Sequence, residues 1–372
     1  MPYSYSIHPS IGVARVGNDP TEFFLAPNSI GGLPIESDLN GNELDIPFTS
    51  FKSGRQKDNL RQIRRQGQKF RIYRYDSDNA NAQPQELNLN DQSLVESFTW
   101  TVHLANKKAA WYEFSELQGN LLLGEDNSYT AQNVPFRNKQ APNRKQLIID
   151  PGPRSISGID QSIAIDRNIP VGYPGYFPYP DPDKTFNGTP IEKLGDLKTD
   201  AEGRLIVIGG HGYSWGLTEL SGYGGGDDWY DDTSDGSVTC TIKLKDKDEL
   251  ITLRAWVIVG PPDFAPEIAN ISSWDDTLFD VSVRHFGLVP EMYDSNQYPN
   301  TQGWNRTYKA NYQRDILPIF ERISRYHWVA NVQSMIAFSA DISGFSDPSD
   351  ENLTKRQKYF ELIIQTIKMD NL

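Results

Sequence analysis

The stretch from residue 222 to residue 268 constrains the fold most, because its pattern is that of two paired strands. From Val238 onward, apolar side chains alternate strictly with polar ones; the apolar set is Val238, Cys240, Ile242 and Leu244. A period of two predicts a strand with one face in a core. After a polar turn at 246–249, residues 251–259 become apolar on both faces, so we expect this hairpin to start at solvent and enter a core. Pro261 and Pro262 end it, because proline cannot donate to a strand ladder.

An acidic and aromatic loop precedes the hairpin. Five aspartates surround Trp229 and Tyr230, namely Asp227, Asp228, Asp231, Asp232 and Asp235. Carboxylates at such spacing repel one another unless cations, backbone donors or water compensate them. Their spacing does not fit an EF-hand, so we assign no metal site here. A turn network in which aspartates cap backbone amides is the favoured interpretation, and a hard-cation site is the alternative.

Composition excludes several classes of protein. The charge is 36 minus 49, or −13, which argues against nucleic-acid binding and against binding to anionic membranes. No run approaches a transmembrane span, and residues 1–10 lack the features of a signal peptide. We therefore expect a cytoplasmic protein, or one exported without a recognisable signal peptide. The single cysteine, Cys240, excludes an intrachain disulfide framework, and its place in the alternating strand predicts an inert core thiol.

The order of the expected elements indicates the fold class. Strand patterns come first, at 11–16, 70–75, 96–104, 146–149 and 204–210, and helical spacing follows at 315–329 and 354–369. The many glycines and prolines favour short strands joined by long ordered loops. We expect a mainly β protein with β-sandwich-like sheets and helices near the C-terminus. The expected domains are a mainly β domain at 1–300 and a helical segment at 301–372 that packs on it or on a partner half.

Three further features carry weak functional signals. Nine basic residues stand between Lys52 and Arg74 against one acid, Asp58, and we interpret them as a basic helix and strand that pair with acidic surface. The glycines at 209–216 match neither the dinucleotide-binding nor the P-loop spacing, so a tight turn is favoured there. The five histidines are scattered, with no pair at helical ligand spacing, and no catalytic residue is assigned.

Several stretches together carry a resemblance to one family. In chain order they are HPSIGVARVGND (8–19), EFFLAP (22–27), FRIYRYD (70–76), WTVHLANKKAAW (100–111), LIIDPGPRSISG (147–158), GRLIVIGG (203–210), DWYDDTSDG (228–236), AWVIVGPPDFAP (255–266) and YQRDILPI (312–319). They span nearly the whole chain. The chain resembles the amino-terminal part of the cysteine-tryptophylquinone amino-acid oxidases, which include L-lysine epsilon-oxidase and glycine oxidase.

The resemblance implies oxidative deamination of an amino acid with O2, giving H2O2 and ammonia. In that family the quinone is built from a Trp and a Cys of the carboxy-terminal half, and Cys240 matches neither quinone position. We therefore expect no cofactor in this chain, and cysteine tryptophylquinone in an absent half that turnover needs. The chain is then a fragment of a longer oxidase or one subunit of a split one. The alternative is a non-catalytic scaffold or binding relative.

The resemblance also suggests a site. We expect Tyr230, with Trp229, Asp231 and Asp232, to form a wall of the substrate channel, because an aromatic edge beside carboxylates suits an ammonium group. A role for Tyr230 in packing the loop is the alternative. The expected partners are an amino-acid substrate and a second subunit or carboxy-terminal half, with no nucleic acid and no membrane. A homo-oligomer stays open.

Overall fold

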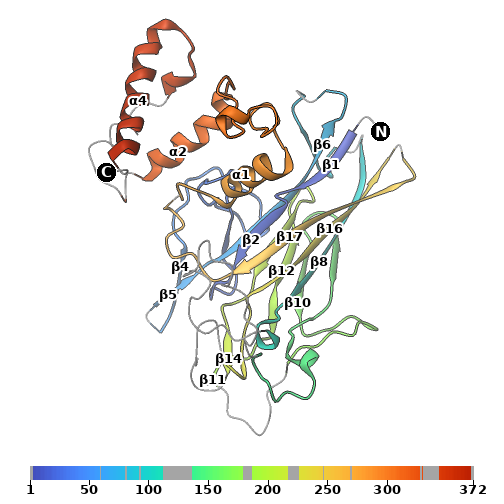
Figure 1. Cartoon of the computed structure of the whole chain (residues 1–372). Coiled ribbons are helices and arrows are strands. Elements are labelled where there is room, and N and C mark those ends of the chain that lie inside the picture. Colours follow the sequence, from blue (N-terminus) through green and yellow to red (C-terminus); the bar gives the residue numbers. More distant parts are fainter. Residues whose placement is uncertain are drawn as a thin grey trace. The chain divides into compact units, whose positions relative to one another are not determined.

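The computed structural model describes residues 3–369 except 59, 80–81, 92–93, 112–135, 179–186, 217–225, 246, 269, 327–328 and 330–342 (Figure 1). The chain divides into two compact units. The strand unit comprises Met1–Ala26 and Pro34–Phe264, and the helical unit comprises Pro27–Leu33 and Ala265–Leu372.

A twelve-stranded sheet forms the strand unit. Its order is β10-β12-β13-β6-β2-β17-β16-β8-β9, and β1, β3 and β7 also pair with β6. The bounds are β1 Tyr3–His8, β2 Ile11–Arg15, β3 Phe23–Leu25, β6 Arg65–Asp76, β7 Gln85–Leu87, β8 Val95–Ala105, β9 Arg154–Ser157, β10 Ser162–Asp166, β12 Lys193–Thr199, β13 Leu205–Gly209, β16 Ser234–Leu244 and β17 Leu250–Gly260. Most neighbours are antiparallel, but β2 runs parallel to β17. Two smaller sheets are β4–β5 (Lys52–Lys57, Leu60–Ile63) and β11-β14-β15 (Asn187–Gly188, Ser214–Gly216, Trp229–Asp231).

The expected hairpin is confirmed. β16 and β17 pair antiparallel from Ser234↔Val259 to Lys243↔Leu250. On its other side β16 pairs with β8, from Asp235↔Ala105 to Leu244↔Val95. The alternating apolar residues of β16 are buried, as the period of two predicts.

The two end strands of the sheet, β9 and β10, approach each other, so the sheet is nearly closed. Its curved halves face one another across one core, in which β8, β13 and β16 supply fully buried side chains such as Trp100, Val207 and Cys240. The mainly β class is therefore confirmed, and the sheet-on-sheet packing occurs within a single sheet.

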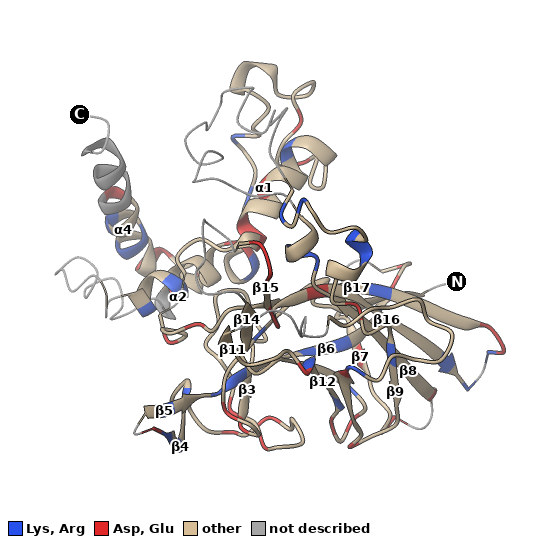
Figure 2. Ribbon diagram, turned by 90° about the horizontal axis from the view of Figure 1, so that it is seen from below, with Lys and Arg blue, Asp and Glu red and all other residues tan. Residues whose placement is uncertain are grey.

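The basic run lies on strands. The expected basic helix is wrong, because the hairpin β4–β5 and strand β6 occupy that part of the chain. Its basic residues do pair with carboxylates, but the partners of two of them lie inside the unit and not on its surface: Arg65 lies 2.7 Å from Asp196, and the buried Lys69 lies 3.0 Å from Asp200. Blue and red segments accordingly lie side by side in the strand unit (Figure 2). These charges are paired inside the unit, and none of the basic residues of β6 is exposed.

The helical unit contains α1 (Trp274–Phe286), α2 (Leu317–Arg325) and α4 (Asp350–Met369). Ser273 and Asp276 form a capping box at the start of α1, and Gly287 ends the helix in the left-handed conformation. Arg322 of α2 donates to both carboxylate oxygens of Asp276, which pins α2 to the start of α1. Helices near the C-terminus are thus confirmed. A π-helical turn, Tyr312–Ile316, precedes α2.

Two local expectations need comment. The strand expected at 146–149 is wrong, because a 3-10 turn covers Arg144–Leu147 and only Ile149 pairs, with Asn106, as an isolated bridge. His327, which falls within the expected helix 315–329, lies outside the described residues. Within the described part, no helix is long and apolar enough to cross a membrane.

Candidate functional site

Asn106, directly after β8, joins that strand to the acidic loop. Its buried amide nitrogen donates to the carbonyl oxygen of Asp231 (2.9 Å), to Asp231 Oδ1 (2.8 Å) and to the carbonyl oxygen of Thr233 (2.8 Å). Its side-chain oxygen accepts the backbone N–H of Lys108 at 2.8 Å. One amide therefore fixes the loop and Lys108 together. Such a buried amide, with its partners satisfied, is costly to remove.

Lys108 compensates the charge of Asp231. Its Nζ donates to Asp231 Oδ2 at 2.6 Å and to Thr233 Oγ1 at 2.7 Å. The same ammonium lies 5.9 Å from the centroid of the Trp229 ring. Asp231 Oδ1 accepts from Asn106 and from the Thr233 hydroxyl, so both of its oxygens are occupied.

Asp232 is the most deeply buried carboxylate of the loop, with 1% of its surface exposed. Burial raises the pKa of this carboxyl to about 6, and the negative charge of Asp231 adds to the rise, while backbone hydrogen bonds from residues 211–213 oppose it. Its Oδ2 has no hydrogen-bond partner among the described residues. A Cβ at position 210 would lie 2.4 Å from this oxygen, which explains why glycine stands there.

Tyr230 lies on β15, where it pairs with Trp215 of β14, and the two rings are 5.8 Å apart. Burial, followed by the charge of Asp228, raises the pKa of its phenol to about 12. The hydroxyl therefore stays protonated at neutral pH. Trp229, the preceding residue, is half-buried.

The other aspartates of the loop point to separate partners. Asp227 accepts the backbone N–H of Asn138, and Asp235 accepts the indole N–H of Trp256 at 3.1 Å. The carboxylates thus bind protein donors, which favours the turn-network interpretation over a shared cation. In the part of the chain that the structure describes, no three His, Cys, Asp or Glu residues gather as metal ligands.

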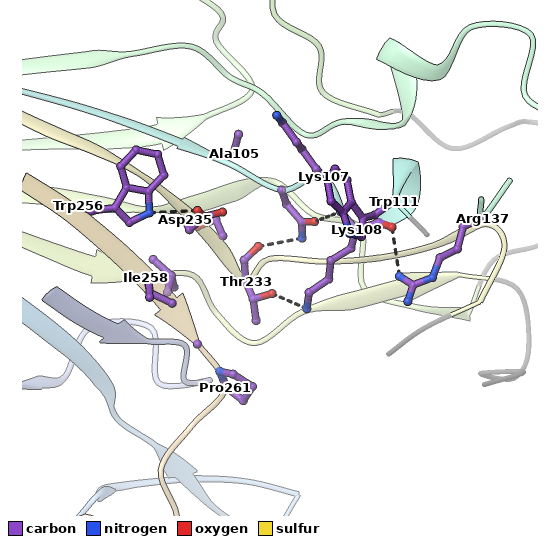
Figure 3. Close-up of a pocket in the computed structure, with 14 residues that line it drawn as sticks. Ala105, Lys107, Lys108, Trp111, Arg137, Thr233, Asp235, Trp256, Ile258 and Pro261 are labelled. Atoms are coloured by element: carbon purple, nitrogen blue, oxygen red, sulfur yellow. Dashed lines mark hydrogen bonds between the residues drawn. The ribbon is translucent and has the colours of Figure 1, made fainter. Parts of the chain in front are cut away.

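A cavity of about 580 Å³ adjoins this network (Figure 3). One row of its floor consists of Ala105, Asp235 and Ile258, which are cross-strand neighbours on β8, β16 and β17. The remaining walls combine aromatic and apolar residues with basic ones; they include Trp111, Trp256, Pro261, Lys107, Lys108 and Arg137. Tyr230, Trp229, Asp231 and Asp232 do not line it. Asp231 is connected to it through Asn106, Lys108 and Thr233, which line the cavity and hydrogen-bond this carboxylate.

A second cavity of about 410 Å³ lies beside Asp150 and Tyr176. Close to it, His103 Nε2 lies 2.7 Å from Asp150 Oδ1, and the Tyr173 hydroxyl donates to Asp150 Oδ2 at 2.9 Å. This cluster joins β8 to the segment that follows Asp150.

The cavity-lining Lys107, Lys108 and Trp111 were not among the sequence-based candidates. Their available signal was a pair of lysines directly after a strand, followed by an aromatic residue, in an acidic chain. Nothing in the local pattern pairs Lys108 with Asp231, 123 positions later.

The chain's own cysteine does not fit a tryptophylquinone. Cys240 lies opposite Trp100 in the β16–β8 register, so a Cys and a Trp are neighbours. Both side chains are at most 1% exposed, and neither lines either cavity. The Trp100 indole N–H is bound to the carbonyl oxygen of Gly203 at 3.0 Å. Within the described residues the pair is enclosed by packed side chains, so it belongs to the core.

Comparisons with known proteins agree with these features. Residues 8–259 match the family model described as L-lysine epsilon oxidase N-terminal. L-lysine 6-oxidase of Marinomonas mediterranea is 51% identical over 365 residues, which are 97% of this chain and 48% of that protein. Crystal structures of the L-Lys epsilon-oxidase from the same organism, alone and as a Schiff base intermediate with L-Lys, have a TM-score of 0.72.

The two crystal structures are 50% and 49% identical to this chain; the match covers 96% of this chain and 50% of theirs. The chain therefore spans about half the length of the curated relatives it matches. The resemblance drawn from the sequence is confirmed: the chain belongs to the L-lysine epsilon oxidase family and matches the amino-terminal part of its members.

Proposed function

We propose that the chain is the amino-terminal part of an amino-acid oxidase, which deaminates an amino acid oxidatively with O2 and releases H2O2 and ammonia. The observation that supports this proposal is 51% identity to L-lysine 6-oxidase over 97% of the chain. L-Lysine is therefore the first substrate to test, with glycine next because the sequence also resembles glycine oxidases.

The cofactor implied by the family is cysteine tryptophylquinone. Cys240 is unfit to build it, so the quinone belongs to residues outside these 372. Once formed there, that group would supply the electrophilic carbonyl that an amine substrate requires. The role left to this chain is to shape the channel and to support the half that carries the quinone.

We propose Tyr230 and Trp229 as the aromatic wall of that channel, with Asp231 and Asp232 behind them. Lys108 compensates Asp231, so the negative charge that attracts a substrate ammonium comes mainly from Asp232 and Asp228. The Tyr230 phenol is protonated and serves as a hydrogen-bond donor.

A chimera tests this proposal. The matched amino-terminal part of the Marinomonas L-lysine 6-oxidase is replaced by this chain, and peroxide release is measured with L-lysine, glycine and a panel of other amino acids. We expect peroxide from the chimera and none from the chain alone. A chimera that is folded and shows quinone absorbance, yet releases no peroxide with any amino acid, would instead support a non-catalytic scaffold or binding protein.

The wall is tested in the same chimera by Tyr230→Phe. If Tyr230 donates a hydrogen bond to the bound substrate, Tyr230→Phe should raise KM and change kcat little. The matched control is Tyr75→Phe. Tyr75 lies at one end of β6, and β6 pairs with β2 at its other end. Equal KM values for Tyr230→Phe and the parent would assign Tyr230 to packing alone.

A further inference from the structure

The cavity beside Asn106 has an unusual charge for this protein. Lys107, Lys108 and Arg137 line it, and Asp235 is the only acid among the described residues that line it, in a chain with a net charge of −13. Lys108 is compensated from behind by Asp231, and Asp235 accepts the Trp256 indole N–H. A local positive patch in an acidic protein favours an anionic ligand.

Lys107 provides the charge that is left for such a ligand. Its ammonium makes no hydrogen bond or ion pair within the described part of the chain, whereas its neighbour Lys108 makes two. Figure 3 shows the two side chains diverging: Lys108 turns to Thr233, and Lys107 extends past Ala105. An exposed ammonium at the rim of a cavity is a ready partner for a carboxylate.

The cavity also has an exposed apolar surface. Trp256 is 43% exposed, Ile258 39% and Trp111 50%, and all three line this cavity. The Trp256 ring is oriented by its hydrogen bond to Asp235, so it presents a fixed flat surface. The volume of about 580 Å³ lies within the roughly 300–1,000 Å³ of small-molecule sites.

We propose that this cavity binds a small organic carboxylate with an aromatic or branched apolar body. The carboxylate pairs with Lys107, and the body lies on Trp256 and Ile258. An inorganic anion would leave this apolar surface in water, and an organic cation would meet Lys107 and Lys108. The proposal goes beyond the oxidase function, because binding is a property of this chain alone and involves no turnover.

The test uses the whole chain and three probes that share a phenyl ring: phenylacetate, 2-phenylethanol and 2-phenylethylammonium. Binding is followed by saturation-transfer NMR and by calorimetry at low salt. We expect saturable binding of phenylacetate, weaker binding of the alcohol and the weakest binding of the ammonium. Raising the salt concentration should weaken the binding of phenylacetate more than that of the other two probes. Equal binding of the three probes, or no saturable binding of phenylacetate, overturns the proposal.

Substitutions assign the binding to this cavity. Lys107→Gln should lower the affinity for phenylacetate about threefold, as expected for the loss of one partly exposed ion pair. The affinity for 2-phenylethanol should stay unchanged. Lys107→Arg should retain the affinity, and Trp256→Leu should weaken both probes. The control is Lys145→Gln, which changes an exposed lysine of the second cavity. An unchanged phenylacetate affinity in Lys107→Gln contradicts the assigned ion pair, and a loss in Lys145→Gln places the probe in the other cavity.

Discussion

Cys240 of β16 lies directly opposite Trp100 of β8, and both side chains face the core of the nearly closed sheet. The chain thus places the two residue types of a tryptophylquinone side by side, yet in surroundings that exclude substrate. Burial also raises the pKa of the Cys240 thiol well above its ordinary value, so the reactive thiolate is absent at neutral pH. Adjacency in a register is therefore insufficient evidence for a cofactor.

This arrangement predicts an unreactive thiol. In the folded chain Cys240 should resist a thiol reagent such as dithionitrobenzoate, and it should react fully after denaturation, because reagent access requires unfolding. The intact mass should equal that of the unmodified sequence. A mass with two added oxygens on Trp100 and a Cys–Trp bond would contradict this prediction and would place a quinone in this chain.

Hydrophobic periodicity predicted the elements that have one apolar and one polar face. Strand β16 alternates apolar and polar residues from Val238 to Leu244, and β8 does so from Phe98 to Leu104. Strand β17 was located by its apolar run at 251–259, and all three were placed to within a few residues. Short strands such as β3 have no such signal, since its three residues are all buried and its pairing with β6 is a long-range contact. Helix α1 was missed because its ends are exposed apolar residues, with Trp274 70% and Phe286 78% exposed, which blur the one-sided stripe.

The candidate site was harder to predict, because its partners are distant in sequence. The sequence shows five aspartates close together but not that Asn106 and Lys108 reach one of them and Asn138 another. Register and loop closure decide those pairs, and no local pattern encodes either. The roles of Tyr230, Trp229, Asp231 and Asp232 at a substrate channel stay a prediction.

The raised pKa of Asp232 predicts how the stability of the protein depends on pH. The folded-state pKa of about 6 lies above the ordinary value of 3.8, so the folded state binds this proton more tightly than the unfolded state does. Stability from this group is therefore greatest below pH 4, falls as the pH rises to about 6 and is constant above that. The full effect is on the order of 2–3 kcal/mol.

Urea unfolding at pH 4.5 and pH 7.5 checks this dependence. The free energy of unfolding of the parent should fall relative to that of Asp232→Asn as the pH rises, because asparagine does not titrate. Asp248→Asn, an exposed turn residue, is the control and should follow the parent at both values. If the free energy of unfolding depends on pH in the same way in the parent and in Asp232→Asn, then ionisation of Asp232 costs little stability, which contradicts the prediction.

Asn106 and Lys108 should differ in their contributions to stability, although both bind Asp231. Asn106→Ala leaves buried acceptors on Asp231 and Thr233 without their donor and should cost about 2–3 kcal/mol. Lys108→Met removes an ion pair whose lysine side chain is 45% exposed and should cost less than about 1 kcal/mol. Chemical denaturation of both variants measures the difference, and a larger loss in Lys108→Met would contradict this ranking.

A substitution at Gly236 tests the close approach of β8 and β16. The register that places Cys240 opposite Trp100 depends on this approach. A Cβ at this position would lie 1.7 Å from the carbonyl oxygen of His103, which is backbone and cannot move aside alone. Gly236→Ala should therefore separate the two strands and cost on the order of 3 kcal/mol or more. The control is Gly54→Ala on β4, where a Cβ meets nothing within 4 Å, and it should be neutral or slightly stabilising. Thermal unfolding ranks the two variants, and equal midpoints would mean that β8 and β16 can separate at Gly236 without loss of the core.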